Sequence, residues 1–225
     1  EMGKYKEAKK NVLKAIEINP NVSIFWEQLG ETSHREGNYH QDIICYEKSL
    51  KIETSAFCLH KKANSLYNLK KYEEAIDCYD KALEIEFEIG TIIDKGDALH
   101  MMEKYEKAID CYDKALEIEP KNILANANKG NSLRANKQFD ESLEYLDEAI
   151  NIDQNDFYGF NNKLILYRDW KKYDKSLELN QQLLKTFPDE EEKLLEQFIE
   201  TYKEMGEQHN VEKYKDKLQK LRDLK

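Results

Sequence analysis

Long apolar runs and leader-like segments are missing from this sequence. No apolar run approaches the eighteen or so residues that a membrane-spanning helix needs, and the first ten residues, EMGKYKEAKK, contain no apolar signal core. Proline is scarce, with three residues in 225. Leu, Ala, Ile, Glu and Lys dominate instead, and these residue types favour helix. We therefore expect a helical, cytoplasmic protein without a membrane segment.

An excess of positive charge is also absent. Lys and Arg number 35 against 45 Asp and Glu, which gives a formal net charge of -10. Proteins that bind nucleic acid draw on clustered Lys and Arg to neutralise phosphates. The charge balance therefore argues against a nucleic-acid partner.

Paired cysteines and clustered histidines are likewise lacking. The four cysteines form no CxxC motif, and Cys45, Cys78 and Cys111 recur 33 residues apart. Equivalent residues on stacked units lie at least a helix diameter apart, beyond the roughly 7 Å that a disulfide spans. His34 and His100 lie two periods apart, too far to share a metal ion. We expect reduced packing cysteines and no metal site.

Catalytic motifs give no better signal. Gly30, Gly96 and Gly130 recur at the repeat period, which indicates close helix packing rather than a phosphate-binding loop. The many carboxylates recur as a charged, solvated face, without a pair marked for general acid and base work. We therefore expect no cofactor and no enzymatic activity.

What the sequence does contain is a repeat. Tyr72–Glu86 reads YEEAIDCYDKALEIE and Tyr105–Glu119 reads YEKAIDCYDKALEIE, a separation of 33 residues. A period of this size predicts a stacked array of helix pairs. Small or apolar residues recur at helical intervals, as at Ala75, Tyr79 and Ala82, and predict the buried face of the second helix in each unit. These second helices are expected to begin at Tyr5, Tyr39, Tyr72, Tyr105, Phe139 and Tyr173.

The pattern resembles the tetratricopeptide repeat. The stretch from Ser23 carries Trp26, Leu29 and Gly30 at the family's spacing, and later units carry its Gly, Ala, Tyr, Ala and Pro positions. The resemblance implies an all-α, right-handed α-solenoid of antiparallel helix pairs. One array over 1–225 is expected, with a partial repeat at 1–22 and two degenerate capping helices at 191–225, which Gly206 separates. Its full repeats are expected at 23–55, 56–88, 89–122, 123–156 and 157–190.

In this family the first helix of each unit lines the concave face, so the resemblance places a binding groove there. The carboxyl-side half of the lining is rich in asparagine, whose amide can pair with the backbone of an extended peptide, and in arginine, which can hold a carboxylate. The amino-side half is acidic because of Glu27, Glu31, Asp94 and Asp97. The predicted groove residues are His60, Lys61, Asn64, Asn128, Asn131, Arg134, Tyr158, Asn161, Asn162 and Arg168.

The sequence leaves several alternatives open. The groove side chains can bind an extended protein segment of mixed or partly acidic charge, or they can be only solvated. The array can be a scaffold by itself, or the targeting arm of a larger protein or enzyme. It can also associate with a second copy into a homodimer, because Val12, Leu13 and Ile16 near the amino end form an apolar face that a partner could cover.

Overall fold

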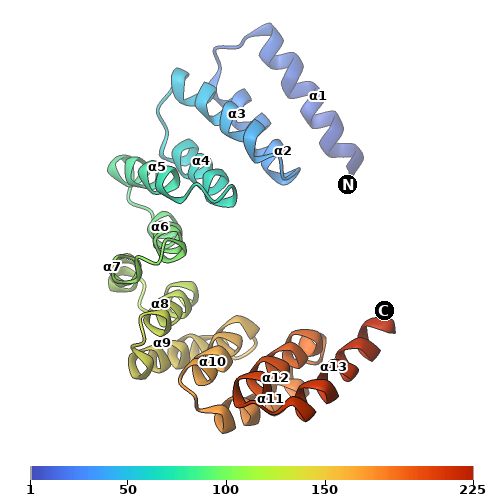
Figure 1. Cartoon of the computed structure of the whole chain (residues 1–225). Helices are drawn as coiled ribbons and strands as arrows, with labels where there is room; N and C mark the ends of the chain where they lie inside the picture. The colour runs from blue at the N-terminus through green and yellow to red at the C-terminus, as the bar shows by residue number, and fades with distance from the viewer. Residues whose placement is uncertain (1, 225) are drawn as a thin grey trace. The chain divides into compact units, whose positions relative to one another are not determined.

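The structure is a computed structural model that describes residues 2–224, without the side chains of residues 2–6 and 8. The chain divides into two compact units, Glu1–Ile118 and Glu119–Lys225. Within the described residues every regular element is a helix, and none is a strand. The prediction of an all-α solenoid is therefore confirmed. Figure 1 shows the helices in chain order, coloured from blue to red.

Each helix of the first unit packs against the next one along the chain. Two first helices of successive pairs, α4 and α6, also contact each other directly. The elements of this unit are α1 (Met2–Ile18), α2 (Ser23–Arg35), α3 (Tyr39–Ile52), α4 (Ala56–Asn68), α5 (Tyr72–Ile85), α6 (Ile89–Met101) and α7 (Tyr105–Ile118).

The second unit repeats this arrangement. Here α8 contacts α10, and α10 contacts α12. The elements are α8 (Ile123–Ala135), α9 (Phe139–Ile152), α10 (Phe157–Asp169), α11 (Tyr173–Thr186), the short 3-10 helix η1 (Pro188–Glu190), α12 (Glu191–Met205) and α13 (Gln208–Asp223). Helices α3, α5, α7, α9 and α11 begin at the predicted aromatic residues. Gly206, in the left-handed region at φ 76°, ends α12 where the sequence predicted an interruption.

The joins inside the helix pairs share one backbone geometry. In each, an amide after the helix bonds to a carbonyl five residues back, as Lys71 N does to Leu66 O at 2.9 Å. This Schellman bond satisfies a carbonyl that the end of the helix would leave unpaired. It requires one residue with positive φ, and these residues are Gly37, Lys70, Glu103, Lys137, Lys171 and Gly206.

A small residue on one helix faces a large one on the next in the core of the first unit. A Cβ built on Gly96 would stand 2.6 Å from the ring of Tyr112, and one on Gly30 would stand 2.8 Å from Tyr46. Both tyrosines are buried. Glycine at these positions therefore allows close packing, as the sequence predicted.

The second unit changes this pairing. Gly130 still lies under a large residue, Leu146. One repeat later, the corresponding positions hold Leu164 and Asn180, and both are buried. The large apolar residue has thus moved from the second helix of the pair to the first.

Lysines on the first helices form ion pairs with carboxylates of the neighbouring helix pair. Lys62 Nζ lies 2.8 Å from Glu47 Oε1, and Lys95 forms an ion pair with Asp80 in the same arrangement. In each case the carboxylate belongs to the second helix of the preceding pair. Lys129 is buried and its ammonium lies 3.8 Å from the centre of the Tyr145 ring.

The amino-terminal helix is better covered than the sequence suggested. Ile16 is buried, and Val12 packs in the same cluster with Leu29 and Trp26. Helix α2 therefore covers most of the face expected to recruit a second copy, and of the three residues named for it, Leu13 alone is exposed. The prediction of an exposed apolar face was therefore wrong for Ile16 and holds for Leu13, while association of two copies stays a prediction.

The four cysteines are buried and free, as expected for packing residues. Burial raises the pKa of the Cys58 thiol to about 11 and raises the pKa values of Cys45, Cys78 and Cys111 as well. The thiolate forms that react or bind metals are therefore disfavoured at neutral pH.

Candidate functional site

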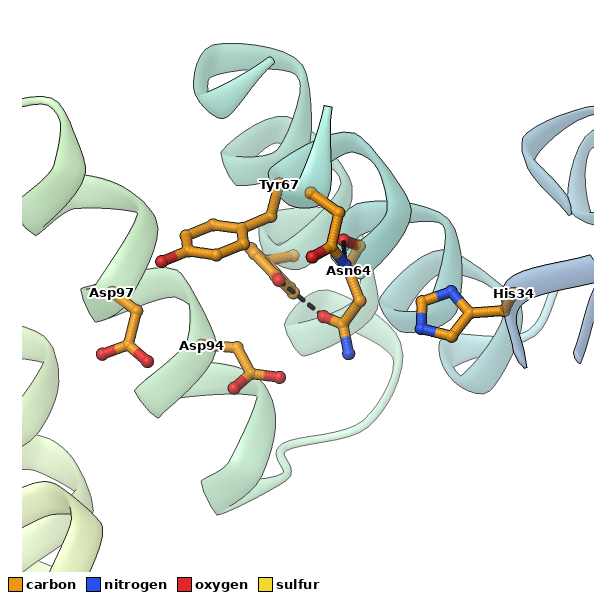
Figure 2. Close-up of a pocket in the computed structure, with 7 residues that line it drawn as sticks. His34, Asn64, Tyr67, Asp94 and Asp97 are labelled. Atoms are coloured by element: carbon orange, nitrogen blue, oxygen red, sulfur yellow. Dashed lines mark hydrogen bonds between the residues drawn. The ribbon is translucent and has the colours of Figure 1, made fainter. Parts of the chain in front are cut away.

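The clearest site is a cavity in the first unit, which we call the first-unit pocket. Its volume is about 240 Å³, and it draws side chains from α2, α4, α5 and α6. Figure 2 shows Tyr67 above Asp94 and Asp97, with Asn64 between them and His34. The pocket is lined by His34, Asn64, Tyr67, Asn68, Tyr79, Asp94 and Asp97.

Repeat geometry explains why these residues meet. His34 and Tyr67 are 33 residues apart, and so are Asn64 and Asp97. Each pair therefore occupies one column on successive first helices. Because α4 packs beside α6, the columns run next to each other and border the same space.

Two tyrosines from the second helices supply hydroxyl groups to these columns. Tyr79 Oη donates to Asn64 Oδ1 at 2.6 Å, and Tyr112 Oη donates to Asp97 Oδ1 at 2.7 Å. Burial raises the pKa of the Tyr79 phenol above its ordinary value, so the hydroxyl keeps its proton. The tyrosines fill the core and also fix the polar side chains on the pocket side.

The His34 ring is bonded to the buried carboxylate of Asp42. Its Nδ1 lies 3.0 Å from Asp42 Oδ2 and 3.2 Å from Ser65 Oγ, while Ser65 donates to Asp42 at 2.8 Å. Asp42 is fully buried, and burial raises its pKa against the opposing effect of the Ser65 and His34 hydrogen bonds. Its second oxygen, Oδ1, has no hydrogen-bond partner.

The first-unit pocket carries net negative charge. Asp94 and Asp97 lie one turn apart on the same face of α6, and none of the described lining residues is a lysine or an arginine. His60, which does not line the pocket, has its Nε2 3.0 Å from Asp94 Oδ2. The pocket thus favours a positively charged group.

The predicted residues His60 and Lys61 border a second space, the loop cavity, beside the join between α5 and α6. His60 Nδ1 lies 2.6 Å from Thr91 Oγ1, which in turn donates to Glu88 at 2.6 Å. The Thr91 hydrogen bond lowers the pKa of Glu88 below its ordinary value. The loop cavity measures about 310 Å³ and is lined by Ala56, Phe57, His60, Lys61, Glu86, Glu88 and Thr91.

A third, larger cavity of about 470 Å³ is formed by α5, α6 and α7 and the join between the last two. Its carboxylates and ammonium groups balance, four of each, so its walls select no sign of charge. The ion pair between Lys95 and Asp80 joins two of these residues. The charged residues are Glu73, Asp77, Asp80, Lys95, Lys104, Lys107, Asp110 and Lys114.

In the second unit the predicted arginines are engaged within the chain. Arg134 forms an ion pair with Asp169 and donates to Asn131 Oδ1 at 2.6 and 3.1 Å. Arg168 donates to Gln197 Oε1 at 2.9 Å, and its Nε lies 3.4 Å from Glu204. Both guanidinium groups are mostly covered. Their charge already has carboxylate partners, which weakens the reason to expect an acidic ligand there.

The predicted asparagines of the second unit differ from one another. Asn128 accepts a hydrogen bond from Tyr158 Oη at 2.8 Å, and Asn161 accepts one from Gln197 Nε2 at 3.3 Å. Asn162 is buried, and its Nδ2 has no partner. A peptide on the surface would not reach it without movement of α10, so we remove Asn162 from the candidate surface.

The sequence predicted Asn64 as a groove residue but did not select the other residues of the first-unit pocket. Asp94 and Asp97 were named only as the source of an acidic half of the lining, and His34 only in excluding a shared metal ion. Tyr79 was assigned to the core alone, although a tyrosine where phenylalanine would serve is a signal for a hydroxyl that needs a partner.

The described part of the chain offers neither a metal site nor a membrane-spanning helix. No group of three or more His, Cys, Asp or Glu side chains is placed to hold a metal ion there. Across the same residues, no helix has the length and apolar character required to span a membrane.

Comparisons with known proteins agree with the repeat pattern. Models described as tetratricopeptide repeat match residues 1–22, 56–87, 93–122 and 111–144. The matched segments are tetratricopeptide repeats. No curated protein matches the sequence.

Solved structures of other proteins have the same fold, and two of the three described here are tetratricopeptide repeat proteins. One from Parabacteroides merdae superposes with a TM-score of 0.82 at 19% identity, covering 97% of this chain and 87% of its own. PilW, a type IV pilus biogenesis factor, gives 0.77 at 19% identity, over 88% and 92%. YrrB, described as having an unusual peptide-binding site, gives 0.64 at 22% identity, over 81% and 95%. At these identities the similarity shows the fold alone.

Proposed function

We propose that this tetratricopeptide repeat protein is a non-catalytic interaction module that binds an extended segment of a partner protein on the first unit, where α2, α4 and α6 line one face. The observation that carries the proposal is the first-unit pocket, which draws its lining from three successive helix pairs. His34, Asn64 and Asp97 lie on three successive first helices, and an extended chain that crosses these helices can contact all three.

The polar groups of this face suit a peptide. The first-unit pocket presents amide groups from Asn64 and Asn68, which can pair with the N–H and C=O of an extended backbone. Asn68 is exposed, with its Nδ2 bonded to Asn64 O at 2.8 Å. YrrB, which shares the fold, is described as a peptide-binding protein, and this supports the same class of ligand here.

The proposal revises the partner's charge. The sequence predicted a segment of mixed or partly acidic charge, with its acidic part opposite Arg134 and Arg168, but these arginines have internal carboxylate partners. The first-unit pocket is acidic instead, so the partner segment should carry positive charge where it crosses α6. A cytoplasmic location stays a prediction of the sequence, as does the single array over 1–225.

A charge insertion tests the binding face. Peptides that bind the whole chain are selected from a random library, and their affinities for Asn68→Arg are measured by fluorescence anisotropy. Asn68→Arg should weaken binding by about tenfold or more, equivalent to about 1.4 kcal/mol, because it adds positive charge and bulk at the pocket. Asn68 is exposed, so the fold should persist, which circular dichroism checks.

Asn11→Arg on α1 is the matched control, because it makes the same chemical change on an exposed residue that does not line the first-unit pocket. It should leave the affinities within about twofold of the original. Equal losses in the two variants, or no loss in Asn68→Arg, would place the peptide elsewhere and refute the proposed face.

A further inference from the structure

We propose that the first-unit pocket is a recognition site for an arginine side chain of the partner segment, with Asp42 acting as the positioning residue for His34. This inference rests on the proposed function. It names the chemical group that the pocket selects.

The size of the first-unit pocket fits one long side chain. Pockets for drug-sized molecules and cofactors occupy about 300–1,000 Å³, and this one measures about 240 Å³. Side chains from four helices surround the space. Such a space can hold the end of a side chain while the rest of the peptide lies outside.

The groups around the pocket are mainly acceptors. Asp94 and Asp97 reach it from α6, and the aromatic ring of Tyr67 forms another wall. A carboxylate has about four acceptor positions, so Asp97 can hold the Tyr112 hydroxyl and a ligand donor at once. A guanidinium has five donors in a planar fork and can stack on an aromatic ring, whereas an ammonium is a compact point charge. The distribution of acceptors over several walls therefore favours arginine over lysine.

His34 adds an acceptor of fixed orientation. Donation of its Nδ1–H to Asp42 leaves Nε2 as the acceptor nitrogen of the ring. In Figure 2 the His34 ring faces the pocket from the side opposite Asp94. Nε2 thus adds an acceptor across the space from the two carboxylates, and the fork of a guanidinium can use both sides.

The buried carboxylate of Asp42 is a second, independent observation in favour of a ligand site beside His34. The positions equivalent to Asp42 hold Ala75 and Ala108 in the following second helices, and these alanines are fully buried. A carboxylate there is costly, since it is fully buried and Oδ1 has no partner. Alanine would serve packing, so the cost points to a role in orienting His34 toward a ligand.

The test measures binding of two small probes to the whole chain by NMR. N-acetyl-arginine amide should shift the backbone resonances of Asn64 and Asp97 and bind about tenfold more tightly than N-acetyl-lysine amide, as expected for a forked donor among several acceptors. Asp97→Asn should abolish this preference. Glu117→Gln, which removes one charge from an exposed position on α7, is the matched control and should keep it. Equal affinities for the two probes would overturn the arginine assignment.

The role of Asp42 has its own readout. Nitrogen-15 spectra of the His34 ring should report the Nδ1–H tautomer in the native chain and in Asp42→Asn, whose amide oxygen can still accept. Asp42→Ala should lose that tautomer and the arginine preference, while keeping its helicity. If the tautomer were unchanged in Asp42→Ala, Asp42 would not position His34.

A library of peptides without arginine separates this inference from the proposed function. If arginine-free peptides bind at the first-unit pocket as tightly as arginine-containing ones, the interaction face stands and the arginine assignment fails. If no peptide of either library shifts the pocket resonances, the proposed function itself fails.

Discussion

The two units carry comparable columns of polar side chains on their first helices, yet they use them differently. In the first unit, Asp94 and Asp97 border a cavity. In the second unit, Arg134 and Arg168 are bonded to carboxylate and amide groups of the same chain. Repeat register therefore decides where a side chain lies, while the residue in the neighbouring column decides whether its charge is available to a ligand.

The second helices differ in a related way. The first unit has a tyrosine at one repeated core position, and the hydroxyls of Tyr79 and Tyr112 bond to the polar columns of the first helices. The second unit has Leu146 and Asn180 at that position. Leu146 has no hydroxyl, and Asn180 donates to Leu194 O instead. The tyrosine hydroxyls of the first unit thus fix side chains of the proposed binding face, which Leu146 and Asn180 do not do in the second unit.

The largest expected effect comes from disturbing the contact between Gly96 and Tyr112, which supports the polar side chains of the first unit. A Cβ in Gly96→Ala would stand 2.6 Å from the Tyr112 ring, so the ring must move. We expect the free energy of unfolding to fall by about 1–3 kcal/mol, as in other overpacked cores. Urea unfolding followed by circular dichroism measures the change. The displaced Tyr112 should also release Asp97 and weaken ligand binding.

Gly90→Ala is the control in the same helix. The nearest atom to a Cβ there is Glu88 Oε1 at 3.5 Å, an ordinary contact. Alanine should then stabilise α6 by as much as about 1 kcal/mol through its higher helix propensity. Equal effects of the two substitutions would show that helix propensity, rather than the tyrosine contact, governs both positions.

Much of the fold could be predicted from the sequence because the positions of the helices follow the period of the repeat. The starts of α3 at Tyr39 and α9 at Phe139 were predicted from the repeat, and Gly206 was predicted to interrupt the last pair. These features are set by local chemistry and by spacing along the chain.

The candidate site was harder to predict because it depends on pairings between helices. Arg134 meets Asp169, 35 residues away, and no periodic signal marks that ion pair. Asn162 occupies the same column as Asn128, but it is buried while Asn128 is partly exposed. Whether an asparagine is accessible depends on the packing of neighbouring helices, which one repeat viewed alone does not reveal.

Asn180→Leu tests the second unit's altered core. The amide of Asn180 donates to Leu194 O at 3.0 Å, but its Oδ1 is buried without a partner. Leucine would remove that unpaired oxygen and restore the residue type found at Leu146. We expect a gain of about 1 kcal/mol in the free energy of unfolding, measured with urea, since an unsatisfied buried acceptor costs about 1–3 kcal/mol and one hydrogen bond is lost.

Asn126→Leu makes the same change at a buried asparagine whose amide is used. Asn126 Nδ2 donates to Pro120 O at 3.1 Å and to Asn122 O at 3.0 Å. This variant should lose about 1–2 kcal/mol. A loss of stability in Asn180→Leu as well would mean that the Leu194 bond outweighs the unpaired oxygen.

The smallest expected effect is that of replacing Glu88, the residue before α6. Its carboxylate bonds to side chains. In the second unit, the residues before α8 and α10 are Asn122 and Asp156, and their side chains accept hydrogen bonds from backbone amides instead. The Thr91 hydrogen bond lowers the pKa of Glu88 from 4.5. Its stabilising contribution is therefore complete above pH 4.5 and disappears as the pH falls through the lower folded value. Because the side chain is mostly exposed, Glu88→Gln should cost only about 0.3 kcal/mol at neutral pH. Urea unfolding at several pH values should show the gap between the two proteins closing in acid, and a gap that widened in acid would contradict the direction of this pKa shift.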